Sequence, residues 1–339
     1  MKNKQIVFTK INTAELLDTE YKAPEANEIV VETAFSTISC GTERANITGD
    51  PNVAGNRPSA VVFPRKLGYS SSGTVIAKGE DVHSVELGDR VAAFHSTHSK
   101  YNVLKEGNFV KIEDDSVSLQ MAALAYIATF PVAAIRKTRL EIGESAIVMG
   151  LGLLGQLAVR FLRAAGAVPI IAADPVEDRR KEALKGGADY AFDPTEKDFA
   201  EKVKAVTSGG VNAAIEVTGV GAGFDGVLDC MARFGRVALL GCTRDKNFTI
   251  DYYKKIHCPG ITVVGAHTVA RPNFESHPGY FTHIDDIKAI LKLCVNKRID
   301  LKSMIKETYM PEDCQEVYTR LINDRNFPVV AQFDWRNFK

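Results

Sequence analysis

The sequence lacks an excess of charge of either sign, and it lacks any long apolar run. Its 42 basic and 42 acidic side chains give a formal net charge of zero, so no net field attracts nucleic acid or an anionic membrane surface. No apolar core of a secretory signal follows the charged N-terminus, and nothing later approaches the roughly eighteen apolar residues that span a bilayer. The composition therefore predicts a cytoplasmic protein that binds a small molecule, without a nucleic-acid or membrane partner.

Cysteine is also scarce. The six cysteines are too widely spaced to form a C-x-x-C pair or a cluster of four, which argues against a disulfide framework and a closed structural zinc site. They are Cys40, Cys230, Cys242, Cys258, Cys294 and Cys314. Apolar residues, in contrast, make up 45% of a chain of 339 residues, which is enough for two hydrophobic cores and predicts two domains.

The order of the sequence patterns predicts how these domains follow one another. Residues 1–125 consist of short β-rich runs separated by turns, such as EIVVETAFSTI and GDRVAAF, which predict a small β-barrel. In residues 126–270, buried strand-like runs alternate with amphipathic helices, which is typical of a parallel sheet with helices on both faces. Residues 271–339 are too few to fill a core alone, so we expect them to pack on the N-terminal barrel. The predicted fold class is α/β, with residues 126–270 inserted into a β-rich domain.

A glycine pattern at residues 150–155 predicts a dinucleotide site. The run GLGLLG places Gly150, Gly152 and Gly155 in G-x-G-x-x-G spacing, after a predicted strand and at the start of a predicted helix. Gly150 permits a tight turn, Gly152 lets the backbone approach a pyrophosphate, and Gly155 lets helix and strand pack closely. We expect the phosphates on the free N–H groups at the N-terminus of that helix.

Asp174 ends the next predicted strand, 19 residues after Gly155, and it predicts the type of dinucleotide. Its carboxylate would accept hydrogen bonds from both ribose hydroxyls and would repel a 2′-phosphate, so the sequence favours NAD over NADP. Arg179 and Arg180 follow closely and could attract that phosphate. NADP therefore stays open as the alternative cofactor.

Further short motifs accompany the glycine pattern in a specific order. They are Gly-Thr-Glu after Cys40, GYSSSG, LGDRVA, KGGADYAFD, AAIEVTGVG and FGRVALLG. With them the whole chain resembles the medium-chain dehydrogenase/reductase superfamily, in its zinc alcohol dehydrogenase-like branch. The resemblance implies a GroES-like β-barrel catalytic domain built from both chain ends, a Rossmann domain between them, and an NAD(P)-dependent oxidoreductase. It also implies a homodimer or homotetramer that pairs through the strand ITVVGAH.

The resemblance also implies which residues contact the cofactor. Thr129 corresponds to a threonine beside the nicotinamide, and Leu154, which follows Leu153 in the glycine turn, corresponds to an aliphatic residue behind that ring. Arg179 matches a basic residue beside the adenosine ribose. The other implied contacts are Thr218, Gly241 and Cys242, which would line the cofactor, and Ala266 and Thr268, which would offer backbone hydrogen bonds to the carboxamide.

The zinc ligands of that family are not matched here. Cys40 fits the first ligand position, but Tyr69 replaces the histidine of the second and Ala125 stands at the third. A catalytic zinc needs about three nitrogen, sulfur or carboxylate ligands from the protein. The sequence therefore predicts no metal site, and the alternative is an improvised site made from Cys40, His95 and His98.

Without a metal, protein hydroxyls must handle the alcohol proton during hydride transfer. Tyr69 is the predicted general acid for ketone reduction and base for alcohol oxidation. Lowering the pKa of its phenol would need a positive charge from His95, Lys100, Arg44 or the nicotinamide. The other interpretation is that Tyr69 only fills the volume of the absent metal. Thr42 matches the hydroxyl relay position of the family.

Glu43 and His95 complete the set of catalytic candidates. Glu43 matches an acidic residue behind the metal ligands of the family, and the competing interpretation is a turn-stabilising ion pair with Arg44 or Arg65. His95 is either a catalyst or a surface histidine.

The predicted function is the NAD-dependent, zinc-independent interconversion of a secondary alcohol and its ketone, with a sugar, a cyclitol or another polar ring compound as substrate. One alternative is a zinc-free NAD(P)H-dependent reductase of activated C=C bonds. Another is a catalytically retired NAD-binding sensor or scaffold.

Overall fold

A computed structural model describes residues 1–50, 62–243 and 247–338, and the chain in it divides into two units. The terminal unit comprises Met1–Ile127 and Ile287–Lys339, and the central unit comprises Ala128–Asp286. The sequence places the corresponding boundaries after residues 125 and 270, and these domain ranges stay a prediction. Residues 271–286 thus lie with the central unit.

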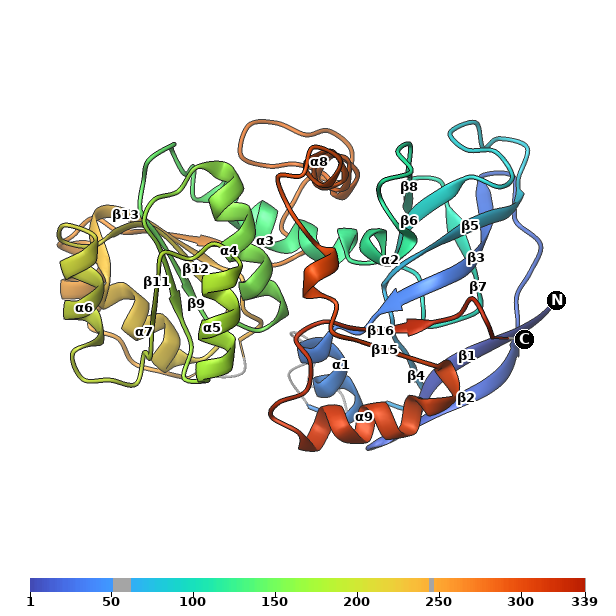
Figure 1. Ribbon diagram of the computed structural model, residues 1–339, viewed down its shortest axis with the longest axis horizontal. Coiled ribbons are helices and arrows are strands. Elements are labelled where there is room, and N and C mark those ends of the chain that lie inside the picture. The colour runs from blue at the N-terminus through green and yellow to red at the C-terminus, as the bar shows by residue number, and fades with distance from the viewer. Residues whose placement is uncertain (51–61, 244–246, 339) are drawn as a thin grey trace. The chain divides into compact units, whose positions relative to one another are not determined.

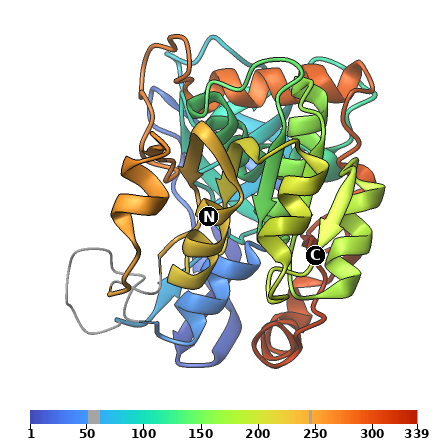
Figure 2. The same ribbon diagram turned by 90° about the vertical axis from the view of Figure 1, so that its left-hand side faces the viewer.

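The central unit is built on a six-stranded parallel sheet with the strand order β11-β10-β9-β12-β13-β14. Helices α4 and α5 pack on β9, β10 and β11, whereas α7 packs on β9, β12 and β13. Figures 1 and 2 show these helices on opposite faces of the sheet. The elements are β9 (Ala146–Met149), α4 (Leu153–Ala165), β10 (Ile170–Ala173), α5 (Glu177–Lys185), β11 (Tyr190–Phe192), α6 (Phe199–Val206), β12 (Val211–Glu216), α7 (Gly221–Asp229), β13 (Met231–Leu239), η2 (Tyr253–His257) and β14 (Thr262–Gly265).

The sequence explains why this sheet is covered on both faces. Every residue of β9 and β10 is buried, so neither strand presents a polar face to solvent. Strands that end at the same edge of a parallel sheet bring the loops after them together, and β9, β10, β12, β13 and β14 all do so here. The predicted α/β class is confirmed.

The terminal unit contains two sheets, one of seven strands in the order β15-β16-β3-β5-β6-β8, with β7 also paired to β3, and one of three strands in the order β2-β1-β4. The N-terminal strands and the C-terminal strand β16 therefore belong to the same unit. The strands are β1 (Lys2–Lys10), β2 (Thr13–Glu20), β3 (Glu28–Thr37), β4 (Arg65–Lys66), β5 (Ser70–Lys78), β6 (Arg90–Phe94), β7 (Tyr101–Lys105), β8 (Phe109–Lys111), β15 (Glu307–Tyr309) and β16 (Ala331–Asp334).

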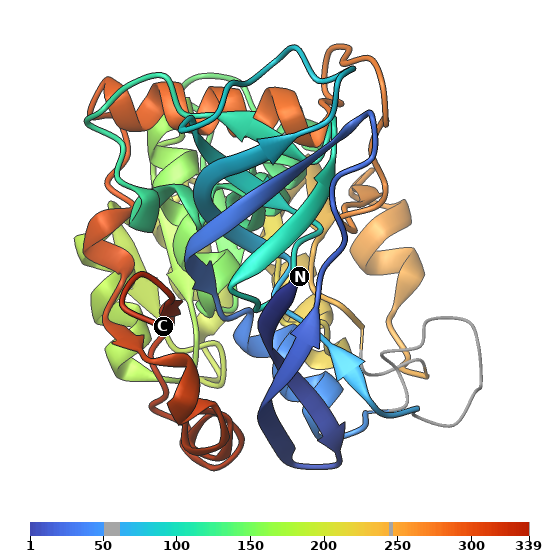
Figure 3. The same ribbon diagram turned by 90° about the vertical axis from the view of Figure 1, so that its right-hand side faces the viewer.

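The helices of the terminal unit lie around these sheets, and α9 packs against β2 and α1 (Figure 3). A core of Trp335, Tyr318, Phe333, Phe8 and Ile38 lies between α9 and the strands. The helices are α1 (Cys40–Ile47), α2 (Leu119–Ala122), η3 (Lys302–Met304), η4 (Pro311–Asp313) and α9 (Cys314–Asn323), while α3 (Ala125–Lys137) and α8 (His283–Val295) cross from one unit into the other. Within the described residues, no helix combines the length and apolar character needed to cross a bilayer.

Candidate functional site

The glycine turn after β9 brings the backbone close to the start of α4. Gly150 has a φ of +96°, in the left-handed region, and a Cβ there would come within 2.9 Å of the Thr218 side chain. A Cβ at Gly155 would lie 1.9 Å from the carbonyl oxygen of Gly150, so only glycine lets α4 approach the turn this closely. Gly152, which precedes α4, has nothing within 4 Å of its Cβ position. The N-terminus of α4 is therefore open to a ligand.

Asp174 lies beside this turn, at the end of β10, and its buried carboxylate joins two segments. One oxygen accepts a hydrogen bond from the N–H of Leu151 (2.8 Å), and the other accepts one from the N–H of Val176 (2.8 Å). The Arg179 guanidinium is 3.7 Å from the same carboxylate. Arg180 instead donates to the backbone carbonyl of Asp174 (2.6 Å). The structure thus places both an acid and a guanidinium where the sequence expects the ribose.

Gln156 connects the glycine turn to α5, and the sequence interpretation overlooked it. Its side-chain amide donates to the carbonyl oxygens of Arg179 (2.8 Å) and Leu151 (3.4 Å), and it is buried. A polar side chain directly after Gly155, in the first turns of a mostly apolar helix, was the available signal.

The loops after β12 and β13 meet at the same edge through Glu216, which is buried. Its carboxylate accepts hydrogen bonds from the Thr218 N–H (2.7 Å), the Thr218 hydroxyl and the Gly219 N–H (3.2 Å), and burial raises its pKa. Its backbone carbonyl accepts the N–H of Gly241 (2.9 Å). Cys242 follows with an exposed thiol. Glu216 was not predicted, although it ends a strand in the same way as Asp174.

The residues expected beside the nicotinamide also lie in the central unit. Thr129 is buried on α3, and its hydroxyl is 3.0 Å from Nδ1 of His283. The N–H of Ala266 donates to the Leu239 carbonyl (2.9 Å), so only the carbonyl of Ala266 is left for a carboxamide. The hydroxyl of Thr268 is buried and has no hydrogen-bond partner among the described residues. Leu153 and Leu154 form the first turn of α4, as the glycine spacing requires.

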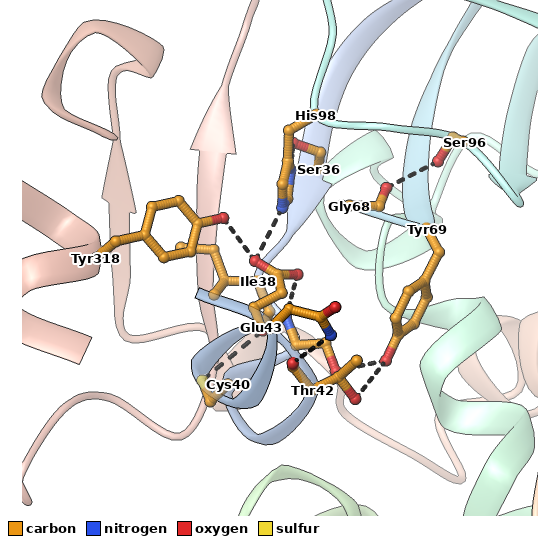
Figure 4. A network of polar contacts seen from close by, with 12 residues as sticks. Ser36, Ile38, Cys40, Thr42, Glu43, Gly68, Tyr69, Ser96, His98 and Tyr318 are labelled. Atoms are coloured by element: carbon orange, nitrogen blue, oxygen red, sulfur yellow. Dashed lines mark hydrogen bonds and ion pairs between the residues drawn. The ribbon is translucent and has the colours of Figure 1, made fainter. Parts of the chain in front are cut away.

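In the terminal unit, Tyr69 points at the start of α1 (Figure 4). Its hydroxyl donates to the Ser39 hydroxyl (2.5 Å) and lies 3.5 Å from the Thr42 hydroxyl. Burial raises the pKa of Tyr69, so the phenol is protonated at neutral pH. Two of the expected cationic neighbours bind elsewhere, because Lys100 donates to the Trp335 carbonyl (2.8 Å) and Arg44 donates to the Leu321 carbonyl (2.9 Å).

Tyr126, from the start of α3, completes the surroundings of Tyr69. Its ring stacks on Phe94 at a centroid distance of 5.1 Å and meets Tyr69 edge-on at 5.8 Å. His95 is exposed, with its ring 5.5 Å from that of Tyr126, and desolvation lowers its pKa. His95 is therefore a neutral neighbour at pH 7 and a poor source of positive charge for the Tyr69 phenol.

Glu43 is completely buried, and its partners differ from those expected. The carboxylate accepts hydrogen bonds from the Ser39 N–H (2.8 Å) and the Tyr318 hydroxyl (2.5 Å), and it lies 3.2 Å from Nε2 of His98 (Figure 4). The predicted ion pair with Arg44 or Arg65 is wrong, because these guanidiniums bind the Leu321 carbonyl and the Asn46 side chain, respectively. Glu43 instead stabilises the N-terminus of α1, which carries Ser39 and Thr42.

His98 extends this network into the β-sheet. Its Nε2 faces the Glu43 carboxylate, and its Nδ1 lies 2.7 Å from the Ser36 hydroxyl. Ser36 in turn accepts a hydrogen bond from the indole N–H of Trp335 (2.9 Å). A Cβ at Gly68 would lie 2.4 Å from the His98 ring, so glycine at this position makes room for the imidazole.

The residues at the zinc positions of the family offer one thiol, one phenol and one methyl group. The Cys40 thiol lies 3.7 Å from the carbonyl oxygens of Ile38 and Pro328, Tyr69 is bound to hydroxyls, and Ala125 offers no ligand atom. Both ring nitrogens of His98 are hydrogen-bonded, which argues against the improvised site. In residues 1–50, 62–243 and 247–338, no three His, Cys, Asp or Glu side chains converge as a metal-binding group would.

Comparisons with known proteins agree with this architecture. The family of zinc-binding dehydrogenases matches residues 154–278. L-threonine 3-dehydrogenase of Pyrococcus horikoshii is 26% identical over 302 residues, which cover 78% of this chain and 83% of that enzyme. D-guloside 3-dehydrogenase of Escherichia coli K12 is 24% identical over 288 residues, which cover 80% and 82%. A short chain alcohol dehydrogenase from E. coli CFT073, solved with NADH, has a TM-score of 0.82 at 17% identity over 98% of this chain and 99% of that chain, and this likeness shows the fold alone.

Proposed function

We propose that this chain, an alcohol dehydrogenase-like oxidoreductase that belongs to the medium-chain dehydrogenase/reductase superfamily, interconverts a secondary alcohol and its ketone with NAD and without zinc. The observation that carries this proposal is the hydroxyl cluster of Tyr69, Ser39 and Thr42, which occupies the positions around the second zinc ligand of the family. A cluster of hydroxyls can move a proton but cannot bind zinc as that ligand set does.

The central unit offers the groups that a dinucleotide needs. The open N-terminus of α4 after Gly152 would bind the pyrophosphate, and Asp174 would accept the ribose hydroxyls. When bound, the nicotinamide supplies or accepts the hydride. Asp174 favours NAD because its charge repels a 2′-phosphate, while Arg179, 3.7 Å away, is the group that would let NADP compete.

The terminal unit would handle the proton. In ketone reduction a hydride adds to the carbonyl carbon and the Tyr69 proton transfers to the oxygen, which leaves a phenolate that the Ser39 and Thr42 hydroxyls can stabilise. Because burial raises the pKa of Tyr69, the phenol starts protonated at neutral pH. Ketone reduction uses this protonated form, whereas alcohol oxidation needs the phenolate, so the rate of oxidation should rise with pH.

The proposed substrate is a sugar, a cyclitol or another polar ring compound. The relative D-guloside 3-dehydrogenase is named for a sugar derivative, which supports this class. The aromatic rings of Tyr69, Tyr126 and Phe94 add rigid apolar area beside the hydroxyls, a combination that suits a ring with one apolar and one polar side. A homodimer or homotetramer is also proposed, because β14 is the outer strand of its sheet and could pair with a second copy.

The Tyr69→Phe variant tests the mechanism, because it removes one oxygen and keeps the ring that contacts Tyr126. We expect turnover to fall by at least about tenfold while the Kd for NADH stays unchanged, since a general acid contributes about 10²- to 10⁴-fold. Turnover is measured by stereospecific hydride exchange with a panel of polyols, ketones and enones. Tyr309→Phe, in the same unit but bonded to Glu307 and Arg320, is the matched control.

Three results would contradict the proposal in different ways. Turnover of Tyr69→Phe close to wild type would remove this phenol from the mechanism. Stoichiometric zinc in fresh, active protein, with inactivation by a chelator, would overturn zinc independence. Binding of NADH with no exchange on any panel member would favour a sensor or scaffold, and exchange with enones alone would favour a C=C reductase.

A further inference from the structure

Lys137, the last residue of α3, binds the segment that follows β14. Its ammonium group donates to the carbonyl oxygens of Gly265 (2.9 Å) and Ala270 (2.5 Å), and the side chain is only 8% exposed. These two carbonyls enclose residues 266–269, which include both residues expected to contact the carboxamide. An ammonium buried against carbonyl oxygens, with no carboxylate partner among the described residues, is costly. Burial and the nearby Arg271 lower the pKa of Lys137.

Arg271 binds in the reverse direction, from the end of this segment to α3. Its guanidinium donates to the carbonyl oxygen of Thr129 (2.9 Å) and to the buried carboxylate of Asp286 (3.2 Å). Arg136 binds the other oxygen of Asp286 (2.9 Å) and stacks over the Phe281 ring at 3.7 Å. Two cations therefore cross-link α3 with residues 265–271, one from each side.

We propose that Lys137 and Arg271 are positioning residues that hold residues 265–271 at a fixed distance from Thr129, and so build the nicotinamide end of the dinucleotide site. The inference rests on the proposed function, because it needs a dinucleotide at this edge of the sheet. The contacts explain why a loop can serve as a rigid wall, since its two flanking carbonyls and the N–H of Ala266 are all bound within the protein. The buried hydroxyl of Thr268, which lacks a partner among the described residues, lies inside the segment so held.

The test compares two ligands that differ only at the nicotinamide end. Lys137→Met keeps the length and apolar stem of the side chain but removes its three donors. We expect the Kd for NADH to rise by at least about tenfold, because a tenfold change corresponds to the loss of about one or two hydrogen bonds. The Kd for ADP-ribose should stay within about twofold of the wild-type value. Isothermal titration calorimetry on the chain of 339 residues measures both constants.

Lys255→Met is the matched control, because Lys255 is a half-buried lysine of the same unit that binds Asp225 (2.7 Å) and Asp229 (2.9 Å) instead of carbonyls near the site. Lys255→Met should leave the ratio of the Kd for NADH to the Kd for ADP-ribose at its wild-type value. Arg271→Lys is the second variant, in case Lys137→Met does not fold, and it should shift the NADH constant in the same direction by losing the contact with Thr129.

The outcomes separate this inference from the proposed function. If wild-type protein binds neither NADH nor ADP-ribose, the proposed cofactor is wrong and the inference falls with it. In a second outcome, the wild type binds both ligands, and the folded variants of Lys137 and Arg271 keep its ratio of the Kd for NADH to the Kd for ADP-ribose. In that case the inference alone is overturned. A selective loss of NADH affinity supports both.

Discussion

The carboxylates at the carboxyl edge of the central sheet and the carboxylate beside α1 in the terminal unit are buried in different ways. In the central unit, Asp174 and Glu216 accept hydrogen bonds mainly from backbone N–H groups of their own strand ends and of the neighbouring glycine turn. In the terminal unit, Glu43 accepts one backbone N–H but relies on the side chains of Tyr318 and His98. A carboxylate held by local backbone can lose its charge without disturbing distant segments, whereas one held by distant side chains ties several elements together.

The largest loss of stability is expected from removal of the Glu43 carboxylate, where side chains from distant segments meet. Glu43→Ala leaves the Ser39 N–H and the Tyr318 hydroxyl without an acceptor in the core, and it removes the carboxylate that Nε2 of His98 faces. We expect the free energy of unfolding to fall by about 3–5 kcal/mol. Urea unfolding followed by fluorescence measures it, because Trp335 is the one tryptophan of the sequence and belongs to the same network. Glu43→Gln, which keeps an acceptor oxygen, should lose less.

A smaller loss of stability, with a larger loss of binding, is expected at the locally held carboxylate. Asp174→Ala leaves two backbone N–H groups unpaired, which should lower the free energy of unfolding by about 1–2 kcal/mol. Its Kd for NADH should rise by about a hundredfold, because two charge-assisted hydrogen bonds to the ribose are lost, and the Kd for NADPH should change far less. If Asp174→Ala and Glu43→Ala lowered the free energy of unfolding equally, the contrast between these two buried carboxylates would be wrong.

The smallest effect is expected from cofactor binding itself, and it needs no mutation. Protection of a thiol from alkylation tests where the cofactor lies. Cys242 and Cys258 are both exposed, but only Cys242 follows a strand at the carboxyl edge of the sheet. With NADH at about ten times its Kd, alkylation of Cys242 should slow by about tenfold, while that of Cys258 continues at its original rate. Peptide mass spectrometry resolves the two thiols. Equal rates at Cys242 with and without NADH would place the cofactor elsewhere.

The contrast also explains how much of the molecule could be predicted from its sequence. The α/β class follows from the alternation of buried strands and amphipathic helices, and it is confirmed. Gly150 and Asp174 could be placed at one edge because each follows a predicted strand of a parallel sheet, and parallel strands end together. Thr218 and Gly241, which follow β12 and β13 at the same edge, were expected only from the resemblance to the family.

The network around Glu43 could not be predicted in the same way. His98 is 55 residues from Glu43, Tyr318 is 275 residues from it, and Trp335 is 299 residues from Ser36. No periodicity or spacing relates side chains at such separations, so the nearest arginines were the natural but wrong partners. Lys137 was overlooked for a different reason. A lysine at the end of a helix usually faces solvent, and nothing in the sequence indicates that this one is buried.

Gly68 has a consequence for the residue that follows it. Because its missing side chain leaves space for the His98 ring, the backbone that carries Tyr69 rests directly on the imidazole. Any bulkier residue at position 68 would push the histidine off Glu43 or move the phenol away from Ser39. The absence of a side chain at position 68 therefore links two features: the orientation of the Tyr69 phenol, the proposed proton donor, and the contact of His98 with the buried Glu43 carboxylate.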